Sequence, residues 1–140
     1  MVSGFNPMRW NCDRDGCFNK KRRPKIEVFA DCFPGGINFG DVDGLVEISG
    51  AFCLLEWKAD GGVLKEGQRR SYVAFTRNPT NVVFVVHGDA ETMKVRSYFV
   101  FWGGTQLATR IADLEELKDH IRKWVDWVRG DIARKELVSA

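Results

Sequence analysis

The sequence predicts an α/β fold in which helices flank a mixed β-sheet, and three observations lead to this fold class. The chain has 140 residues, of which 44% are hydrophobic and 29% charged, and this is the composition of one globular domain. Apolar runs of strand length alternate along the chain with segments of helical periodicity. Short turn signals separate these pieces at Pro34-Gly35-Gly36, Ser49-Gly50, Gly61-Gly62, Asn78-Pro79 and Gly103-Gly104.

The first predicted element is a helix over residues 25–32. Pro24 suits its first turn, and the turn that begins at Pro34 ends it. Ile26 and Val28 fit a strand equally well, so the strand remains the alternative to the preferred helix. Residues 1–24 precede this element as a basic segment that contains two cysteines.

Two apolar runs, residues 38–48 and 51–58, flank Ser49-Gly50 and predict a β-hairpin with a two-residue turn. Ile48 then faces Ala51, and every opposed pair of positions sums to 99. The period of two places one apolar set on a single face of the hairpin: Val42, Val46, Cys53, Leu55 and Trp57.

The second half of the chain predicts a helix, two strands and a last helix. Residues 63–77 form the helix, and Asn78-Pro79 stops it. Residues 81–87 and 94–102 are apolar enough for the interior of a sheet, with a polar turn around Gly88-Asp89 between them. A helix over residues 111–129 packs on the sheet through one apolar stripe, formed by Leu114, Leu117, Ile121, Trp124 and Val128.

Charge and hydropathy narrow the function classes. The longest apolar runs fall far short of the roughly 18 residues that a membrane span needs, and the N-terminus lacks the layout of a secretory signal. We therefore expect a cytoplasmic protein with reduced cysteines and no membrane partner. Residues 1–25 carry seven basic and two acidic residues, or +5, so the rest of the chain carries −3 of the net +2. The basic run over residues 20–25 suits a polyanion such as nucleic acid, and a solvated basic loop is the equal alternative.

The hairpin register places four charged side chains on one face of the sheet. Asp43 faces Glu56, and Asp41 faces Lys58. Two carboxylates that are directly opposed lie about 5 Å apart at Cβ and destabilise the pair unless a cation offsets them. Carboxylate oxygens are the ligands that Mg²⁺ or Mn²⁺ prefers. The Lys58 ammonium lies on the same face, where it can orient a water or stabilise the charge that develops on a phosphate.

Three motifs in this order resemble the PD-(D/E)xK nuclease superfamily, closest to its RecB-like and VRR-like variants. They are Gly40-Asp41-Val42-Asp43, Leu54-Leu55-Glu56-Trp57-Lys58, and Gln68 followed by Tyr72. Val42 stands where the superfamily name has proline. The resemblance covers residues 25–102 as the catalytic core of one nuclease domain over residues 1–140. It implies a restriction-endonuclease-like sandwich with a sheet of about four or more strands. In its small size, the chain resembles phage or mobile-element nucleases of bacterial cells.

The resemblance also implies roles for individual residues. Asp43, Glu56 and the main-chain carbonyl of Trp57 would bind Mg²⁺ or Mn²⁺, and Lys58 would assist the attacking water. Gln68 and Tyr72 would support the catalytic site or contact DNA. Asp41 and Glu27 are further candidate ligands, although Asp41 can instead be a surface partner for Lys58. The candidate DNA contacts are Lys20, Lys21, Arg22, Arg23, Lys25, Arg69, Arg70 and Tyr72.

Other motifs favour structural roles. Cys12 and Cys17 have the spacing of half a zinc site, but a closed structural site needs four ligands, so bound zinc is the less favoured interpretation. Cys53 lies in an apolar strand and is expected to be a buried, inert thiol. His87 and His120 have no second histidine at metal spacing and are expected to be structural or surface residues.

The sequence therefore predicts a metal-dependent DNA nuclease that hydrolyses phosphodiester bonds with structure or end selectivity, because phosphate contacts carry little sequence information. The alternative is a non-catalytic nucleic-acid-binding or inhibitor protein of phage type that retains the nuclease fold. Homo-oligomerisation and a protein partner in a DNA-processing complex both stay open.

Overall fold

The structure is a computed structural model that describes residues 24–37 and 39–139, with side chains as far as residue 130. The chain forms two compact units, Met1–Asp41 and Val42–Ala140. In the first unit, the element η2 (Ile26–Cys32) is a 3₁₀ helix, so the preferred helix is confirmed over the strand. The rings of Phe29 and Phe33 both contact Phe39 edge to face, at 5.9 and 5.2 Å between centroids.

The second unit is built on a six-stranded mixed sheet in the order β1-β2-β3-β4-β5, with β6 also paired to β4. Its elements are β1 (Gly44–Ile48), β2 (Ala51–Lys58), α1 (Glu66–Phe75), β3 (Val82–Asp89), β4 (Lys94–Trp102), β5 (Thr105–Gln106), β6 (Arg110–Ile111) and α2 (Leu114–Ser139). β2 and β3 run parallel with α1 as their crossover, and the other pairs are antiparallel. The predicted α/β class with a mixed sheet is thus confirmed.

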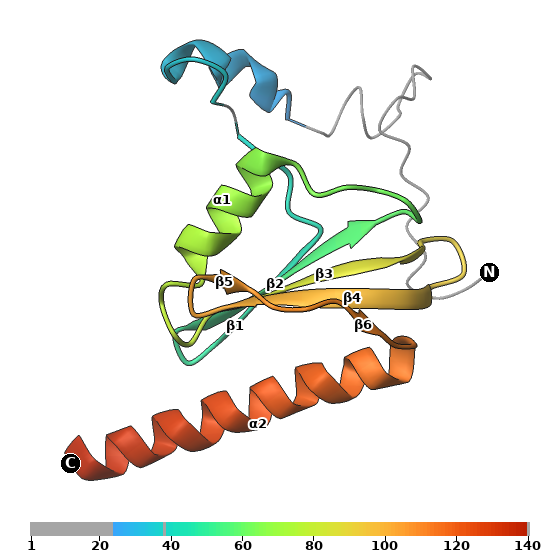
Figure 1. Cartoon of the computed structure of the whole chain (residues 1–140). Helices are drawn as coiled ribbons and strands as arrows, with labels where there is room; N and C mark the ends of the chain where they lie inside the picture. The colour runs from blue at the N-terminus through green and yellow to red at the C-terminus, as the bar shows by residue number, and fades with distance from the viewer. Residues whose placement is uncertain (1–23, 38, 140) are drawn as a thin grey trace. The chain divides into compact units, whose positions relative to one another are not determined.

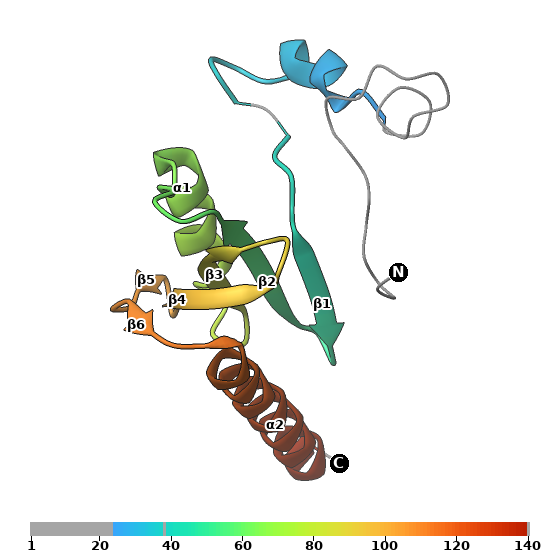
Figure 2. The same ribbon diagram turned by 90° about the vertical axis from the view of Figure 1, so that its right-hand side faces the viewer.

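The two helices cover opposite faces of the sheet (Figures 1 and 2). On the α1 face, Val83 and Val85 of β3 pack with Tyr72 of α1 in one core cluster. On the α2 face, Phe84 and neighbouring strand residues pack against Trp124 and the rest of the predicted apolar stripe. The alternation of consecutive β3 residues between two clusters follows from the period of two in a strand. We refer to these as the α1 face and the α2 face.

The hairpin between β1 and β2 has the predicted register, with Ile48 opposite Ala51 and Gly44 opposite Leu55. Ser49 and Gly50 both have positive φ, at 50° and 87°, as a two-residue turn of this kind requires.

The first strand, however, begins at Gly44, so the prediction that it starts at residue 38 is wrong. Asp43 explains the end of the ladder. Its Oδ2 accepts the Trp57 N–H at 2.6 Å, a donor that a continued strand would offer to the Val42 carbonyl. Asp41 and Asp43 consequently lie outside the strand, so the ladder forms neither of the two predicted cross-strand pairs, Asp41 with Lys58 and Asp43 with Glu56.

Two further boundaries, of α1 and β3, differ from the predicted ones. The α1 helix starts at Glu66 rather than residue 63, where the Gln68 side chain accepts the backbone N–H of the N-cap residue Lys65. Strand β3 continues through the expected turn at Gly88 by means of a bulge after His87. A side chain is excluded at Gly88, since a Cβ there would lie 2.2 Å from the Lys94 carbonyl oxygen.

The short strands β5 and β6 were not predicted, and α2 begins at Leu114 and runs beyond residue 129. Within the described part of the chain, no helix combines the length and the hydropathy that crossing a bilayer requires.

Candidate active site

Glu56 is a buried carboxylate on the α1 face, with 6% of its surface exposed. β2 aims it at that face because Glu56 aligns with Val85 of the α1-face cluster. Burying an unpaired carboxylate costs several kcal/mol, so it needs partners. It has three: Lys58 Nζ lies 3.3 Å from Oε1, Gln68 Nε2 donates to Oε1 at 3.0 Å, and the Tyr72 hydroxyl donates to Oε2 at 3.1 Å. Glu56, Lys58, Gln68 and Tyr72 form what we call the Glu56 cluster.

The first turn of α1 positions Gln68. As the third residue after the N-cap Lys65, its Oε1 accepts the Lys65 backbone N–H at 3.3 Å and the Lys58 ammonium at 3.0 Å. With Oε1 occupied by two donors, the Nε2 group faces Glu56. The start of a helix carries partial positive charge, which favours carboxylates beside it. The amide therefore connects the helix, the lysine and the buried carboxylate in one arrangement.

Asp43 lies beside this cluster at the start of β1 and is exposed. Its hydrogen bond to the Trp57 N–H joins it to the residue between Glu56 and Lys58 on β2. Both carboxylates lie near the Tyr72 hydroxyl, since the charges of Glu56 and Asp43 each raise its pKa. Asp43 thus presents a solvent-accessible carboxylate next to a buried one.

Tyr72 is 7% exposed, and its hydroxyl is committed to Glu56. Burial first, then the charge of Glu56 and the hydrogen bond to it, raise the pKa of Tyr72 above its usual range. The phenol remains a proton donor to the carboxylate at neutral pH. Of the two roles that the resemblance implies for Tyr72, this burial favours support of the site over a contact with DNA, since the side chain hydrogen-bonds Glu56 from inside the core.

His87 is a residue near this site whose position the sequence did not predict. In the parallel β2–β3 pair it aligns with Lys58, and its ring contacts Phe99 of the α1-face cluster. Its Nε2 lies 3.0 Å from the Gly62 carbonyl oxygen, and its buried Nδ1 has no hydrogen-bond partner among the described residues. Only the parallel register of β2 and β3 would have placed it beside Lys58, and no turn between these strands fixes that register in the sequence.

The donor set suits a hard divalent cation. No three His, Cys, Asp or Glu side chains converge on one point anywhere in the described residues. Mg²⁺, however, commonly binds one or two carboxylates and keeps its remaining ligands as water or substrate phosphate. Asp43 and Glu56 supply two carboxylates, and the main chain of Trp57 adjoins Asp43. These residues therefore fit Mg²⁺ or Mn²⁺, with Asp43 on the solvent side.

The predicted DNA-contacting residues fall into two groups. Lys20, Lys21, Arg22 and Arg23 lie outside the described residues, whereas Lys25 is exposed at the N-cap of η2. On α1, Arg69 donates to Gln106 and pairs with Glu66, while Arg70 is exposed and makes no ion pair with any described residue. Arg70 is therefore the cation of this helix that is available to a phosphate.

The remaining candidates are not members of the Glu56 cluster. Glu27 and Asp41 belong to the first unit and stay candidates from the sequence alone. Cys12 and Cys17 lie outside the described residues. Cys53 is 7% exposed, and burial raises its pKa to about 11, so this thiol is protonated and inert at neutral pH as expected.

The arrangement on the α1 face combines an exposed carboxylate, a buried carboxylate and a lysine held by a glutamine amide. Such a set can bind a divalent cation and present an ammonium to a phosphate. Comparison of the chain with protein-family models, with curated proteins and with solved structures finds no match. Its similarity to the PD-(D/E)xK nucleases stays a prediction that depends on the residues themselves.

Proposed function

We propose that this protein is a divalent-metal-dependent nuclease that hydrolyses phosphodiester bonds in DNA. One observation carries the proposal: the buried Glu56 pairs with the half-buried Lys58 on the α1 face, both are held by Gln68, and the exposed Asp43 lies beside them. Charges inside an apolar sheet are costly and are rarely found without a function or a dedicated set of partners. Here the partners hold one carboxylate and one ammonium in fixed positions near solvent.

Each residue has a distinct role in this proposal. Asp43 and Glu56, with the Trp57 carbonyl, would hold the cation, which when bound stabilises phosphate charge and lowers the pKa of water. Lys58 faces the phosphate with its ammonium and stabilises the charge that develops in the transition state. Gln68 and Tyr72 are positioning residues, since they orient Lys58 and Glu56 without touching the substrate.

Backbone contacts supply affinity for DNA in this proposal. The exposed Arg70 lies two residues after Gln68 on α1, and the basic run over residues 20–25 adds cations. Such contacts neutralise phosphates and release counterions, so they carry little sequence information. Replacement of Arg70 by alanine should weaken DNA binding and reduce the salt slope of log K by about 1.

The closed hydrogen bonding of the Glu56 cluster favours a second candidate function, a non-catalytic DNA-binding or inhibitor protein. Both oxygens of Glu56 already accept donors from the chain itself, so the cluster is stable without a cation. In that case the carboxylates are structural. Binding would then persist in EDTA and in an Asp43→Asn variant, with no strand cleavage under any condition.

Cleavage of a DNA panel tests the proposal directly. Supercoiled, linear, single-stranded and branched DNA are incubated with the full chain in Mg²⁺ or Mn²⁺ and, separately, in EDTA. We expect metal-dependent cleavage that falls by at least about 100-fold in Asp43→Asn and in Glu56→Gln, because each removes a charge aimed at the reaction. Glu91→Gln is the matched control, since Glu91 is exposed in the turn between β3 and β4.

Gln68→Ala provides a graded test within the same panel. A positioning residue that holds a lysine and a metal-binding carboxylate should cost about 10- to 100-fold in activity or metal affinity. Comparing Asp41→Asn with Asp43→Asn identifies the carboxylate that serves the site. Folded protein that cleaves none of the substrates, or cleavage that survives both Asp43→Asn and Glu56→Gln, would contradict the proposal.

A further inference from the structure

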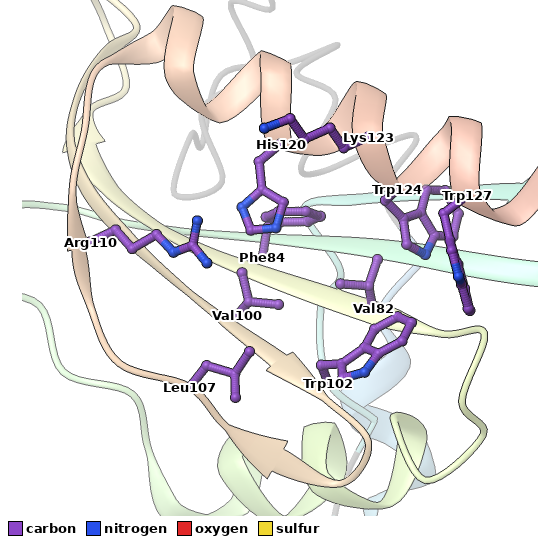
Figure 3. A pocket seen from close by; sticks show the side chains of 10 residues that line it. All are labelled: Val82, Phe84, Val100, Trp102, Leu107, Arg110, His120, Lys123, Trp124 and Trp127. Carbon is purple, nitrogen blue, oxygen red and sulfur yellow. The ribbon is translucent and has the colours of Figure 1, made fainter.

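A cavity of about 280 Å³ lies on the α2 face, on the opposite side of the sheet from the Glu56 cluster (Figure 3). Val82, Phe84 and Val100 form its apolar floor. The helix α2 and the end of β4 form its walls, because Trp102 belongs to β4 and Trp124 to α2. Its volume is near the lower limit of small-molecule pockets.

Aromatic side chains line one end of this cavity. Trp102 and Trp127 meet edge to face with their centroids 5.0 Å apart, and both line the cavity. Trp127 is 37% exposed, although the other large apolar residues of α2 are buried or half-buried as far as residue 130. Trp124 is fixed, since its Nε1 donates to the Thr80 carbonyl at 3.1 Å. Rings held in place with exposed π faces are the platforms on which nucleobases stack.

Cations line the other end. Arg110 of β6 and Lys123 of α2 flank His120 in Figure 3. Neither forms an ion pair with any described residue, while Lys118 and Arg122 on the same helix are paired with Glu115 and Asp119. The part of the chain that the structure describes contributes no carboxylate to the lining. The cavity thus holds two positive charges without a counter-charge from its own walls.

His120 lies between the two cations and adds a neutral polar group. Its Nδ1 shares a hydrogen bond of 2.7 Å with the Tyr98 hydroxyl. Burial, followed by the charges of Arg110 and Lys123, lowers the pKa of His120, so its ring is neutral at pH 7. The positive potential that disfavours a charged imidazole is the potential that attracts an anion.

We propose that this cavity binds a nucleotide, with the base against Trp102 and Trp127 and the phosphate between Arg110 and Lys123. A phosphate monoester carries about −1.5 to −2 charges at pH 7, which two cations match and a carboxylate does not. Arg recognises phosphate through its planar fork and Lys as a point charge. The phosphate and base can come from a free mononucleotide or from the terminal nucleotide of a DNA strand, and the experiment separates these sources.

Calorimetry and NMR on the full chain test the proposal without any cleavage assay. The probes are deoxyadenosine 5′-monophosphate, deoxyadenosine, inorganic phosphate, indole-3-acetate and a 5′-phosphorylated six-nucleotide single strand. We expect the monophosphate to bind at least about tenfold more tightly than deoxyadenosine or phosphate alone, because it engages both ends of the cavity. The indole N–H signals of Trp102, Trp124 and Trp127 should shift, while that of Trp57, outside the cavity, should not.

Matched variants identify the binding residues. Arg110→Ala and Lys123→Ala should each raise the Kd for the monophosphate by about tenfold, the loss of one charge-assisted contact. Lys118→Ala is the control, since Lys118 is on the same helix but not in the lining. Trp127→Ala removes a partly exposed ring, so the fold should persist while base affinity falls.

Each alternative outcome has a definite meaning. Tighter binding of the phosphorylated strand than of the mononucleotide, weakened in Arg110→Ala, assigns the site to a DNA end, and the reverse order of affinities assigns it to free nucleotides. Equal binding of phosphate alone would reduce the cavity to an anion site and overturn the proposal. Equal binding of indole-3-acetate would assign the cavity to aromatic acids and overturn the proposal. Absence of binding by every nucleotide would also overturn the proposal. None of these results depends on the proposed nuclease activity, because the cavity and the Glu56 cluster occupy opposite faces.

Discussion

Charged side chains are paired on one face of the sheet and unpaired, among the described residues, on the other. On the α1 face, the buried Glu56 and the half-buried Lys58 neutralise each other, with Gln68 and Tyr72 completing their hydrogen bonds. On the α2 face, Arg110 and Lys123 remain at the edge of an apolar cavity without ion pairs among the described residues. One face satisfies its charges internally, and the other presents them to an outside partner.

This difference shows that the two faces make different demands on the backbone. A buried network needs fixed geometry, and three regular elements provide it: the β1–β2 hairpin, β3 and the capped start of α1. Exposed cations at the rim of a cavity do not need a fixed hydrogen-bond network. The short strand β6 and one turn of α2 are enough to hold them. Breaking a charged contact should therefore cost stability on the α1 face and binding on the α2 face.

Substitution of the two lysines provides the strongest test of this comparison. Lys58→Met leaves the Glu56 carboxylate buried without its cation, and removing one partner of a buried pair costs about 3 kcal/mol. Lys123→Met removes a charge from a rim that has no partner, so the free energy of unfolding should stay within about 0.5 kcal/mol. Urea unfolding at pH 7 measures both values.

A double variant separates the loss of the lysine charge from the loss of the lysine methylene groups. Glu56→Gln combined with Lys58→Met removes both charges, so it should be more stable than Lys58→Met alone. Equal losses for Lys58→Met and Lys123→Met would show that the buried pair contributes nothing special, and the contrast between the faces would fail.

A smaller effect is expected from removing single hydroxyl groups. Tyr72→Phe deletes a donor to a carboxylate, and hydrogen bonds to charged groups contribute about 1.5–3 kcal/mol. Tyr98→Phe deletes a partner of the neutral His120 ring and should cost about 1 kcal/mol. Both tyrosines are almost fully buried, so the packing loss is matched between the variants. A larger loss for Tyr98→Phe than for Tyr72→Phe would contradict the charge assignment of the two faces.

The hairpin and the last helix were predictable because local rules determine them. The Ser49-Gly50 turn fixes the register of β1 with β2, and that register alone aims Glu56 and Lys58 at one face. The apolar stripe from Leu114 to Val128 likewise determines which side of α2 meets the sheet. At the Ser49-Gly50 turn, the sequence contained enough information to place the side chains of both strands.

Long-range pairing was not predictable in the same way. The parallel register of β2 with β3 places His87 beside Lys58, and the α1 crossover between these strands leaves that register unspecified locally. The start of β1 depends on a side chain, Asp43, that takes a backbone donor from the ladder. The α2-face cavity requires β6 to bring Arg110 back to β4, and a two-residue strand has no detectable period.

Acid destabilisation that depends on His120 is the smallest effect expected, and it reports the unpaired charge of the α2 face. The groups around this ring are Tyr98 of β4, Arg110 of β6 and Lys123 of α2, and burial and the two cations lower its pKa below the ordinary 6.5. The unfolded chain therefore binds a proton at a pH where the folded chain does not. Stability rises with pH wherever the unfolded state binds more protons, so the contribution is complete above pH 6.5 and is lost as the pH falls below that value. Unfolding in urea at pH 7.5, 6.5 and 5.5 should show a steeper loss in the native chain than in His120→Gln, which keeps a polar partner for Tyr98. Parallel curves would contradict the lowered pKa of His120 and, with it, the unpaired positive charge assigned to this face.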